Sequence, residues 1–115
     1  ATQGMLTYDL FSRMKPNATF INTGRGAQVV EADLLRALRE EPDRTALLDV
    51  TWPEPPEEDS PLLTQENVFL SPHIAGSMRN EAARMGAYME EEYRRFAQDL
   101  PTRYEVTLPM LETMA

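Results

Sequence analysis

Three short apolar runs constrain the fold of this chain more than any other feature. The runs cover residues 18–22, 45–50 and 67–71. The segment 31–40, between the first two, has leucines at helical spacing, with acids early and arginines late. Strand, helix and strand at this spacing predict a βαβ unit in a parallel sheet. Because the run 45–50 is nearly all apolar, we expect its strand to be covered on both faces. The sequence therefore predicts an α/β fold.

A polar side chain follows each predicted strand by a few residues. Arg25 follows the first strand, Glu54 the second and His73 the third. Ligands bind beyond the carboxyl ends of strands in open parallel sheets, so we expect the three side chains at one edge. A histidine close to a carboxylate can act as acid or base near neutral pH, and an arginine can hold a carboxylate or polarise a carbonyl. An acidic loop residue or a loop histidine alone is usually just solvated, but their joint placement favours a functional site. We expect the flanking Gly24 and Gly26 to let the backbone turn sharply and approach a ligand.

The segment 51–66 is rich in proline and acids. A structureless loop of about 16 residues is more often functional or disordered than neutral. Trp52 and the leucine pair 62–63 predict that this loop packs down onto the domain. Asp49, just before it, is a predicted buried carboxylate that needs a partner. That partner is either a set of local backbone amides or a ligand.

The rest of the chain predicts two helices and a tail. A short helix is expected over 8–14, and a long one over 78–98 with Ser77 as its N-cap. The methionine and aromatic stripe of the long helix is typical of a side that faces a core. We expect residues 99–115 to form an irregular or partly extended tail. The predicted division is therefore a domain over 1–98 and a tail.

Composition excludes several classes of protein. A length of 115 residues allows one domain at most. A net charge of −8 argues against nucleic acid and anionic membrane partners. The absence of cysteine excludes disulfides and thiol chemistry, a single histidine excludes a histidine-rich metal site, and we expect no metal. No apolar run has the length of a membrane span or a signal peptide, and we expect a cytoplasmic location.

Three ordered motifs resemble the C-terminal signatures of the D-isomer-specific 2-hydroxyacid dehydrogenases. They lie at 14–26, 48–55 and 60–76, and the resemblance covers about residues 2–98. That family includes glyoxylate/hydroxypyruvate reductases, phosphoglycerate dehydrogenases and formate dehydrogenases. The resemblance implies the C-terminal part of a Rossmann-type parallel sheet, with about three strands and flanking helices, in an incomplete domain. It also implies hydride transfer between NAD or NADP and a 2-hydroxy/2-oxo acid pair.

The resemblance also implies roles for individual residues. Arg25 resembles the arginine that binds the substrate carboxylate and carbonyl. His73 resembles the acid/base that takes the hydroxyl proton during oxidation and returns it during reduction. Glu54 resembles the carboxylate that pairs with that histidine and stabilises its protonated form. The implied cofactor contacts are Asp49 for the nicotinamide carboxamide, the backbone of Thr23 and Gly24 nearby, and Ala75 and Gly76 beside the ring.

The chain also departs from the family pattern. No Gly-x-Gly-x-x-Gly follows a strand here, and in the family that loop, the ribose-binding acid and the substrate domain all lie upstream. Met78 stands where a threonine is common in the family. We therefore expect a piece that is inactive alone and that forms a homodimer or self-associates through exposed apolar surface. Neither the 2-hydroxy acid nor the choice between NAD and NADP follows from the sequence. A non-enzymatic NAD-binding protein like the related corepressors, or an interaction module, is the alternative.

Overall fold

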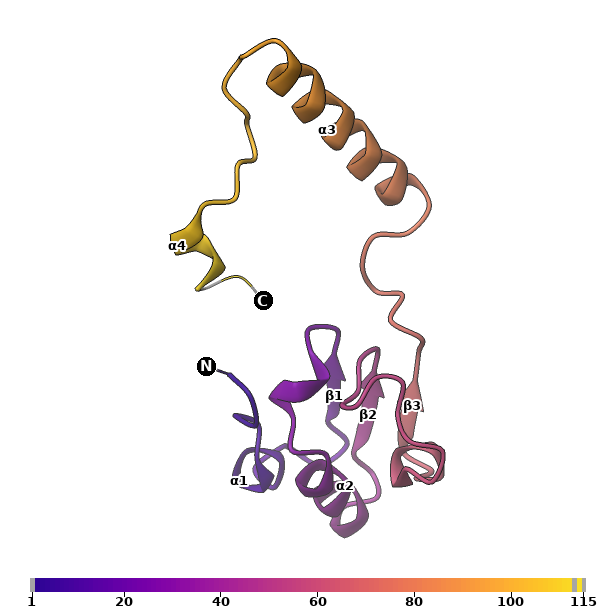
Figure 1. Ribbon diagram of the computed structural model, residues 1–115. Coiled ribbons are helices and arrows are strands. Elements are labelled where there is room, and N and C mark those ends of the chain that lie inside the picture. The colour runs from indigo at the N-terminus through magenta and orange to yellow at the C-terminus, as the bar shows by residue number, and fades with distance from the viewer. Residues whose placement is uncertain (1, 113, 115) are drawn as a thin grey trace. The chain divides into compact units, whose positions relative to one another are not determined.

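The chain divides into two compact units, one ending at Gly76 and one beginning at Ser77. The computed structural model describes residues 2–112 and 114, and Figure 1 shows its helices and strands. The two units are described separately below. The domain boundary predicted after residue 98 stays a prediction.

The first unit is built on a three-stranded parallel sheet with the order β1-β2-β3. The longer of its helices, α2, connects β1 to β2 (Figure 1). These elements confirm the predicted α/β fold with a βαβ unit and a parallel sheet. Their bounds are α1 Tyr8–Phe11, β1 Thr19–Asn22, the 3₁₀ turn η1 Gly26–Gln28, α2 Glu31–Glu40, β2 Thr45–Leu48, the 3₁₀ turn η2 Pro61–Leu63 and β3 Val68–Leu70.

The core of this unit lies between α2 and one face of the sheet. The leucine stripe of α2 is fully buried there, with Leu34 and Leu38 at 0% and 1% exposure. Ala46 and Leu48 of β2 meet this stripe from the sheet. Burying a leucine side chain contributes about 1.5–3 kcal/mol, so this contact accounts for much of the stability of the unit.

The opposite face of the sheet is exposed. Ile21, Leu47 and Phe69 stand side by side in the strand register and are 61%, 39% and 57% exposed. Among the described residues up to Gly76, no helix buries this row. The expectation that β2 is covered on both faces is therefore wrong for this unit, because its helices pack on one side only. Self-association through such a surface stays a prediction.

Two long-range polar side chains that the sequence did not predict tie the elements together. The Asn67 side-chain amide donates to the carbonyls of Leu38 and Arg44, at 3.0 and 2.8 Å, so it joins the end of α2 to the start of β2. Arg44 is 7% exposed. Its guanidinium donates to three carbonyls at and after the end of α1, those of Phe11, Ser12 and Met14, at 3.3, 3.1 and 2.5 Å.

We expect Arg44→Met to lower the free energy of unfolding by about 2–3 kcal/mol, because hydrogen bonds from a charged donor are lost and the carbonyls remain. Urea denaturation of the protein that carries this chain measures the loss. Arg39→Met is the matched control, since Arg39 is exposed on α2, and it should change stability by less than about 0.5 kcal/mol. Equal midpoints for the two variants would contradict the role of Arg44.

Other elements differ from prediction in detail. α1 ends at Phe11 rather than at residue 14. Leu62 packs into the core at 1% exposure, as predicted for its loop, but Trp52 is 61% and Leu63 is 52% exposed. The loop therefore packs onto the domain through Leu62, as predicted, but the Trp52 side chain is not part of the buried contact. The η2 turn explains the difference between the two leucines, because it directs only Leu62 inward.

The second unit contains α3, Asn80–Ala97, and α4, Leu108–Leu111. The helix α3 begins after Arg79, whose backbone φ of 49° is left-handed and ends any helical run from residue 78. Ser77 is therefore not the N-cap. The predicted tail contains the short α4, and Glu92 of α3 accepts hydrogen bonds from the amides of Arg103 and Tyr104.

The apolar stripe of α3 is exposed in this unit. Met89 and Phe96 are 61% and 72% exposed, and α3 has no buried residue. The prediction that this stripe faces a core is thus wrong for the unit as described. None of the described helices combines the length and apolarity needed to cross a membrane.

Candidate active site

Two of the three polar residues singled out in the sequence form a hydrogen-bonded pair at the carboxyl edge of the sheet. The Nδ1 atom of His73 lies 2.7 Å from Oε1 of Glu54, and the two side chains are 46% and 39% exposed. An ionised carboxylate only accepts hydrogen bonds, so Nδ1 carries the proton. This fixes the ring orientation and leaves Nε2 as the nitrogen that can exchange a proton with a ligand.

The backbone at His73 is unusual. Its φ is 52°, in the left-handed region, and its amide donates to the Ser71 carbonyl at 3.0 Å. Such a conformation costs about 1–3 kcal/mol in a residue other than glycine, so the surrounding contacts must hold it. The tight turn places the imidazole beside the loop that carries Glu54.

Asp49 organises the loop that carries His73. It is 5% exposed, and its carboxylate accepts from the Ser71 hydroxyl at 2.5 Å and from the amides of Ile74 and Ala75 at 2.9 and 2.8 Å. Local hydrogen bonds therefore satisfy this buried carboxylate. These bonds, from Ser71 first and then from the two amides, hold the pKa of Asp49 below its ordinary value of 3.8.

We expect Asp49→Asn to loosen the loop and to remove part of the acid sensitivity of the protein. A carboxyl whose pKa is lowered by folding stabilises the fold above its unfolded pKa, and this contribution is lost as pH falls through the lower folded pKa. The window therefore lies below pH 3.8. In the variant, one hydrogen of the introduced side-chain amide would face a backbone N–H, so hydrogen exchange at Ile74 and Ala75 should speed up at neutral pH. Unchanged exchange at both amides would contradict this role.

Two cavities meet at Asp49. One of about 480 Å³ is lined by Asp49, Glu54 and His73, together with Pro55 and Pro56. The other, of about 280 Å³, lies against the exposed face of the sheet and is lined by apolar side chains and three predicted cofactor contacts. Those three are Thr23, Asp49 and Ala75. An apolar groove with a few convergent polar groups is typical of a small-molecule site.

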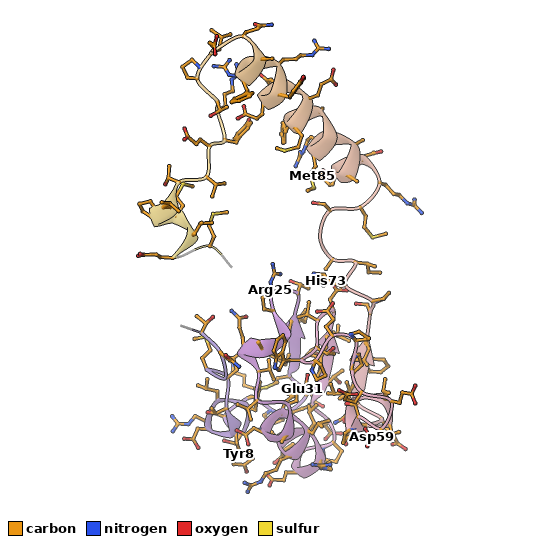
Figure 2. All side chains as sticks on the ribbon, in the orientation of Figure 1. Tyr8, Arg25, Glu31, Asp59, His73 and Met85 are labelled. Carbon is orange, nitrogen blue, oxygen red and sulfur yellow. The ribbon has the colours of Figure 1, made fainter. Side chains whose placement is uncertain are left out.

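Arg25 is not hydrogen-bonded to the pair formed by Glu54 and His73. Figure 2 shows Arg25 and His73 at the same end of the sheet. The Arg25 side chain is exposed, and its Nη1 donates to the neighbouring Gly24 carbonyl at 2.8 Å. Among the described residues it makes no hydrogen bond or ion pair with Glu54 or His73. Gly76 is in open space, since nothing lies within 4 Å of a Cβ placed there.

Gly26 has a structural role that the sequence did not predict. A Cβ placed on it would lie 2.0 Å from the carbonyl oxygen of Thr51. The absence of a side chain at Gly26 therefore lets its backbone pack closely against the loop that follows β2. The approach of this turn to a ligand stays a prediction. Gly24 is less restricted, because the nearest atom to its placed Cβ is the Gln28 side-chain oxygen at 3.3 Å.

Two hydroxyl residues next to the site were missed in the sequence. Ser71 donates to Asp49, and the Thr51 hydroxyl donates to the Pro53 carbonyl at 2.8 Å within the loop that carries Glu54. The only sequence signal is their position at the end of a predicted strand. Ser71 is the last residue of one run and Thr51 directly follows another, and a proline comes one or two residues later.

The comparisons with known proteins point to one family. Residues 1–75 match the family model described as D-isomer specific 2-hydroxyacid dehydrogenase, NAD binding domain. The chain is 38% identical to D-3-phosphoglycerate dehydrogenase of Archaeoglobus fulgidus, over 96% of this chain and 21% of that protein. It is 44% identical to human glyoxylate reductase/hydroxypyruvate reductase, over 67% of this chain and 24% of that protein.

Solved structures agree. A crystal structure of an NADPH-dependent glyoxylate/hydroxypyruvate reductase from Sinorhizobium meliloti, in complex with NADP and sulfate, matches with a TM-score of 0.75 and 32% identity. The match covers 91% of this chain and 34% of that one. A Thermus thermophilus protein matches with a TM-score of 0.83 and 32% identity, over 92% of this chain and 34% of that one. The chain thus spans between a fifth and a quarter of the two curated relatives.

Proposed function

Because this chain belongs to the D-isomer-specific 2-hydroxyacid dehydrogenases, we propose that the protein carrying it transfers a hydride between a nicotinamide cofactor and a 2-hydroxy/2-oxo acid pair. The observation that carries the proposal is the contact of 2.7 Å between His73 and Glu54. An oriented imidazole with one free nitrogen is what proton transfer to or from a substrate oxygen requires.

In this proposal His73 is the acid/base. During reduction, His73 gives the proton on Nε2 to the carbonyl oxygen of the 2-oxo acid, and during oxidation it takes the proton back. Glu54 accepts the hydrogen bond from Nδ1 and so holds the ring in one orientation, with Nε2 directed away from it. The same pair therefore serves both directions of the reaction.

Arg25 is the proposed anchor for the substrate. Its guanidinium is exposed at the same end of the sheet as His73 and is not tied up by an acid in the described part of the chain (Figure 2). A guanidinium binds a carboxylate through two parallel hydrogen bonds and can polarise the adjacent carbonyl. Arg25 would thus orient a 2-oxo acid relative to His73.

The groove at Thr23, Asp49 and Ala75 fits the nicotinamide end of the cofactor. The ring supplies or accepts the hydride when it is bound. The apolar lining from Ile21, Leu47 and Phe69 suits a flat ring. Asp49 already accepts three hydrogen bonds, and a carboxylate has about four acceptor positions, so one remains for a carboxamide. We propose NAD or NADP as the cofactor, with Gly24 and Gly76 near the ring.

The test is an assay of the full-length product of the gene that encodes this chain, because the chain alone is expected to be inactive. Oxidation of NADH and of NADPH is followed at several concentrations of glyoxylate and hydroxypyruvate, the 2-oxo acids named for the relatives. Turnover of either acid is the expected result. Tight cofactor binding without turnover of any 2-oxo acid would instead favour a non-enzymatic NAD-binding protein.

A further inference from the structure

The loop that carries Glu54 is anchored to the first turn of α2. The backbone amide of Trp52 donates to Oε1 of Glu31 at 2.8 Å. Trp52 precedes Glu54 by two residues, and Glu54 contacts His73. Glu31, Trp52 and Glu54 therefore connect the first turn of α2 to the proposed acid/base pair.

The Glu31 carboxylate does not cap the N-terminus of its own helix. No side chain caps the N-terminus of α2, although an acid in the first turn is favoured by the helix dipole. Burial raises the pKa of the Glu31 carboxyl above its ordinary value, and the hydrogen bond from Trp52 opposes that rise. A half-buried carboxylate needs a hydrogen-bond partner, and the Trp52 amide is that partner.

The exposure of the Glu54 side chain makes this anchor important. This side chain is 39% exposed, and its only hydrogen bond among the described residues goes to His73. The direction in which the Glu54 side chain points therefore depends on the position of the backbone of its loop. The Trp52 side chain does not hold it, because it is 61% exposed.

We propose that Glu31 is a positioning residue that holds the Glu54 carboxylate against His73 through the Trp52 amide. The inference rests on the proposed function, since it concerns the acid/base pair named there. Glu31 touches neither substrate nor cofactor in this proposal, so its loss should slow the chemical step and leave cofactor binding unchanged.

The same helix turn offers a matched control. Asp33 also accepts a hydrogen bond from a distant backbone amide, that of Tyr8 at 3.0 Å. Asp33 therefore resembles Glu31 in chemistry and in place, but the segment that it holds is the start of α1. The substitution Asp33→Ala should cost stability as Glu31→Ala does, without changing the site.

Three variants of Glu31 in the full-length protein distinguish the effect of side-chain length from the effect of its charge. Glu31→Gln keeps an oxygen at the same distance and should retain kcat within about threefold. Glu31→Asp keeps the charge but is shorter by one methylene, and it should lower kcat about tenfold to a hundredfold, as Glu31→Ala does, because the pair is misplaced. The KM for the cofactor should not change in any of them. Loss of kcat in Asp33→Ala equal to that in Glu31→Ala would overturn the proposal.

A second measurement does not depend on turnover. The Nδ1 proton of His73 should give a downfield proton NMR signal, assigned by its absence in His73→Gln. The signal should persist in Glu31→Gln and Asp33→Ala and be lost or broadened in Glu31→Asp. Its persistence in Glu31→Asp overturns the inference. Absence of turnover in a wild-type protein that shows the signal would refute only the proposed function.

Discussion

His73→Ala is expected to lower the kcat for reduction of a 2-oxo acid about 100-fold to 10,000-fold, because the general acid is removed. Binding of the reduced cofactor should be unchanged, since the predicted cofactor groove is lined by Thr23, Asp49 and Ala75 and not by His73. Both quantities are measured on the full-length protein, the first by steady-state kinetics and the second by fluorescence titration of the bound nicotinamide. The fold should survive, because the ring makes one hydrogen bond and is 46% exposed.

A companion pair of variants tests the partner of this histidine. Glu54→Gln should produce a smaller loss of kcat, about tenfold to a hundredfold, because a neutral amide oxygen accepts the hydrogen bond from Nδ1 more weakly than a carboxylate does. Glu58→Gln is its control, an exposed carboxylate of the same acidic loop, and should behave as wild type. Full activity in His73→Ala would refute the assignment of the acid/base, whatever the result at Glu54.

Gly26→Ala is expected to destabilise the protein by about 3 kcal/mol, at the upper end of the cost of overpacking. The added methyl group would lie 2.0 Å from the Thr51 carbonyl oxygen and 2.1 Å from its carbonyl carbon. Both are backbone atoms, so neither can rotate away, and the loops after β1 and β2 must separate. Activity should fall as well, because these loops carry Arg25 and Glu54.

Urea denaturation and steady-state kinetics measure the two effects. Gly76→Ala is the control for stability alone, since its methyl group meets nothing within 4 Å, and stability should change by less than about 0.5 kcal/mol. Gly24→Ala should be intermediate, because the contact at 3.3 Å is with the flexible Gln28 side chain. If Gly26→Ala unfolds at the same urea concentration as Gly76→Ala, the two loops do not pack as described.

Local patterns in the sequence predicted the elements well. The leucine spacing of α2 predicted its bounds, Glu31–Glu40, because a helix with one buried stripe is defined by its own residues. The short apolar runs located each strand to within two residues at either end. The meeting of Glu54 and His73 could also be expected, because parallel strands bring their carboxyl ends to one edge.

Contacts between distant backbone segments could not be predicted in this way. Nothing near Arg44 in the sequence indicates that it binds the carbonyls after α1, and nothing near Gly26 indicates Thr51. The exposure of the Trp52 side chain could not be predicted for a similar reason. An indole normally favours burial, but here the loop is held by its backbone, at the Trp52 amide and the Pro53 carbonyl.

The loop at His73 is shaped by its neighbours, and this affects how the protein can evolve. Asp49 accepts hydrogen bonds from Ser71, Ile74 and Ala75, which flank position 73 on both sides. The side chain at position 73 makes a hydrogen bond only to Glu54 among the described residues. The side chain at position 73 can therefore be replaced while the hydrogen bonds from the loop to Asp49 are kept. A left-handed φ of 52° restricts the choice, favouring asparagine, aspartate or glycine and disfavouring β-branched residues. Such a position lets a new chemistry be tried by one substitution while the surrounding loop keeps its form.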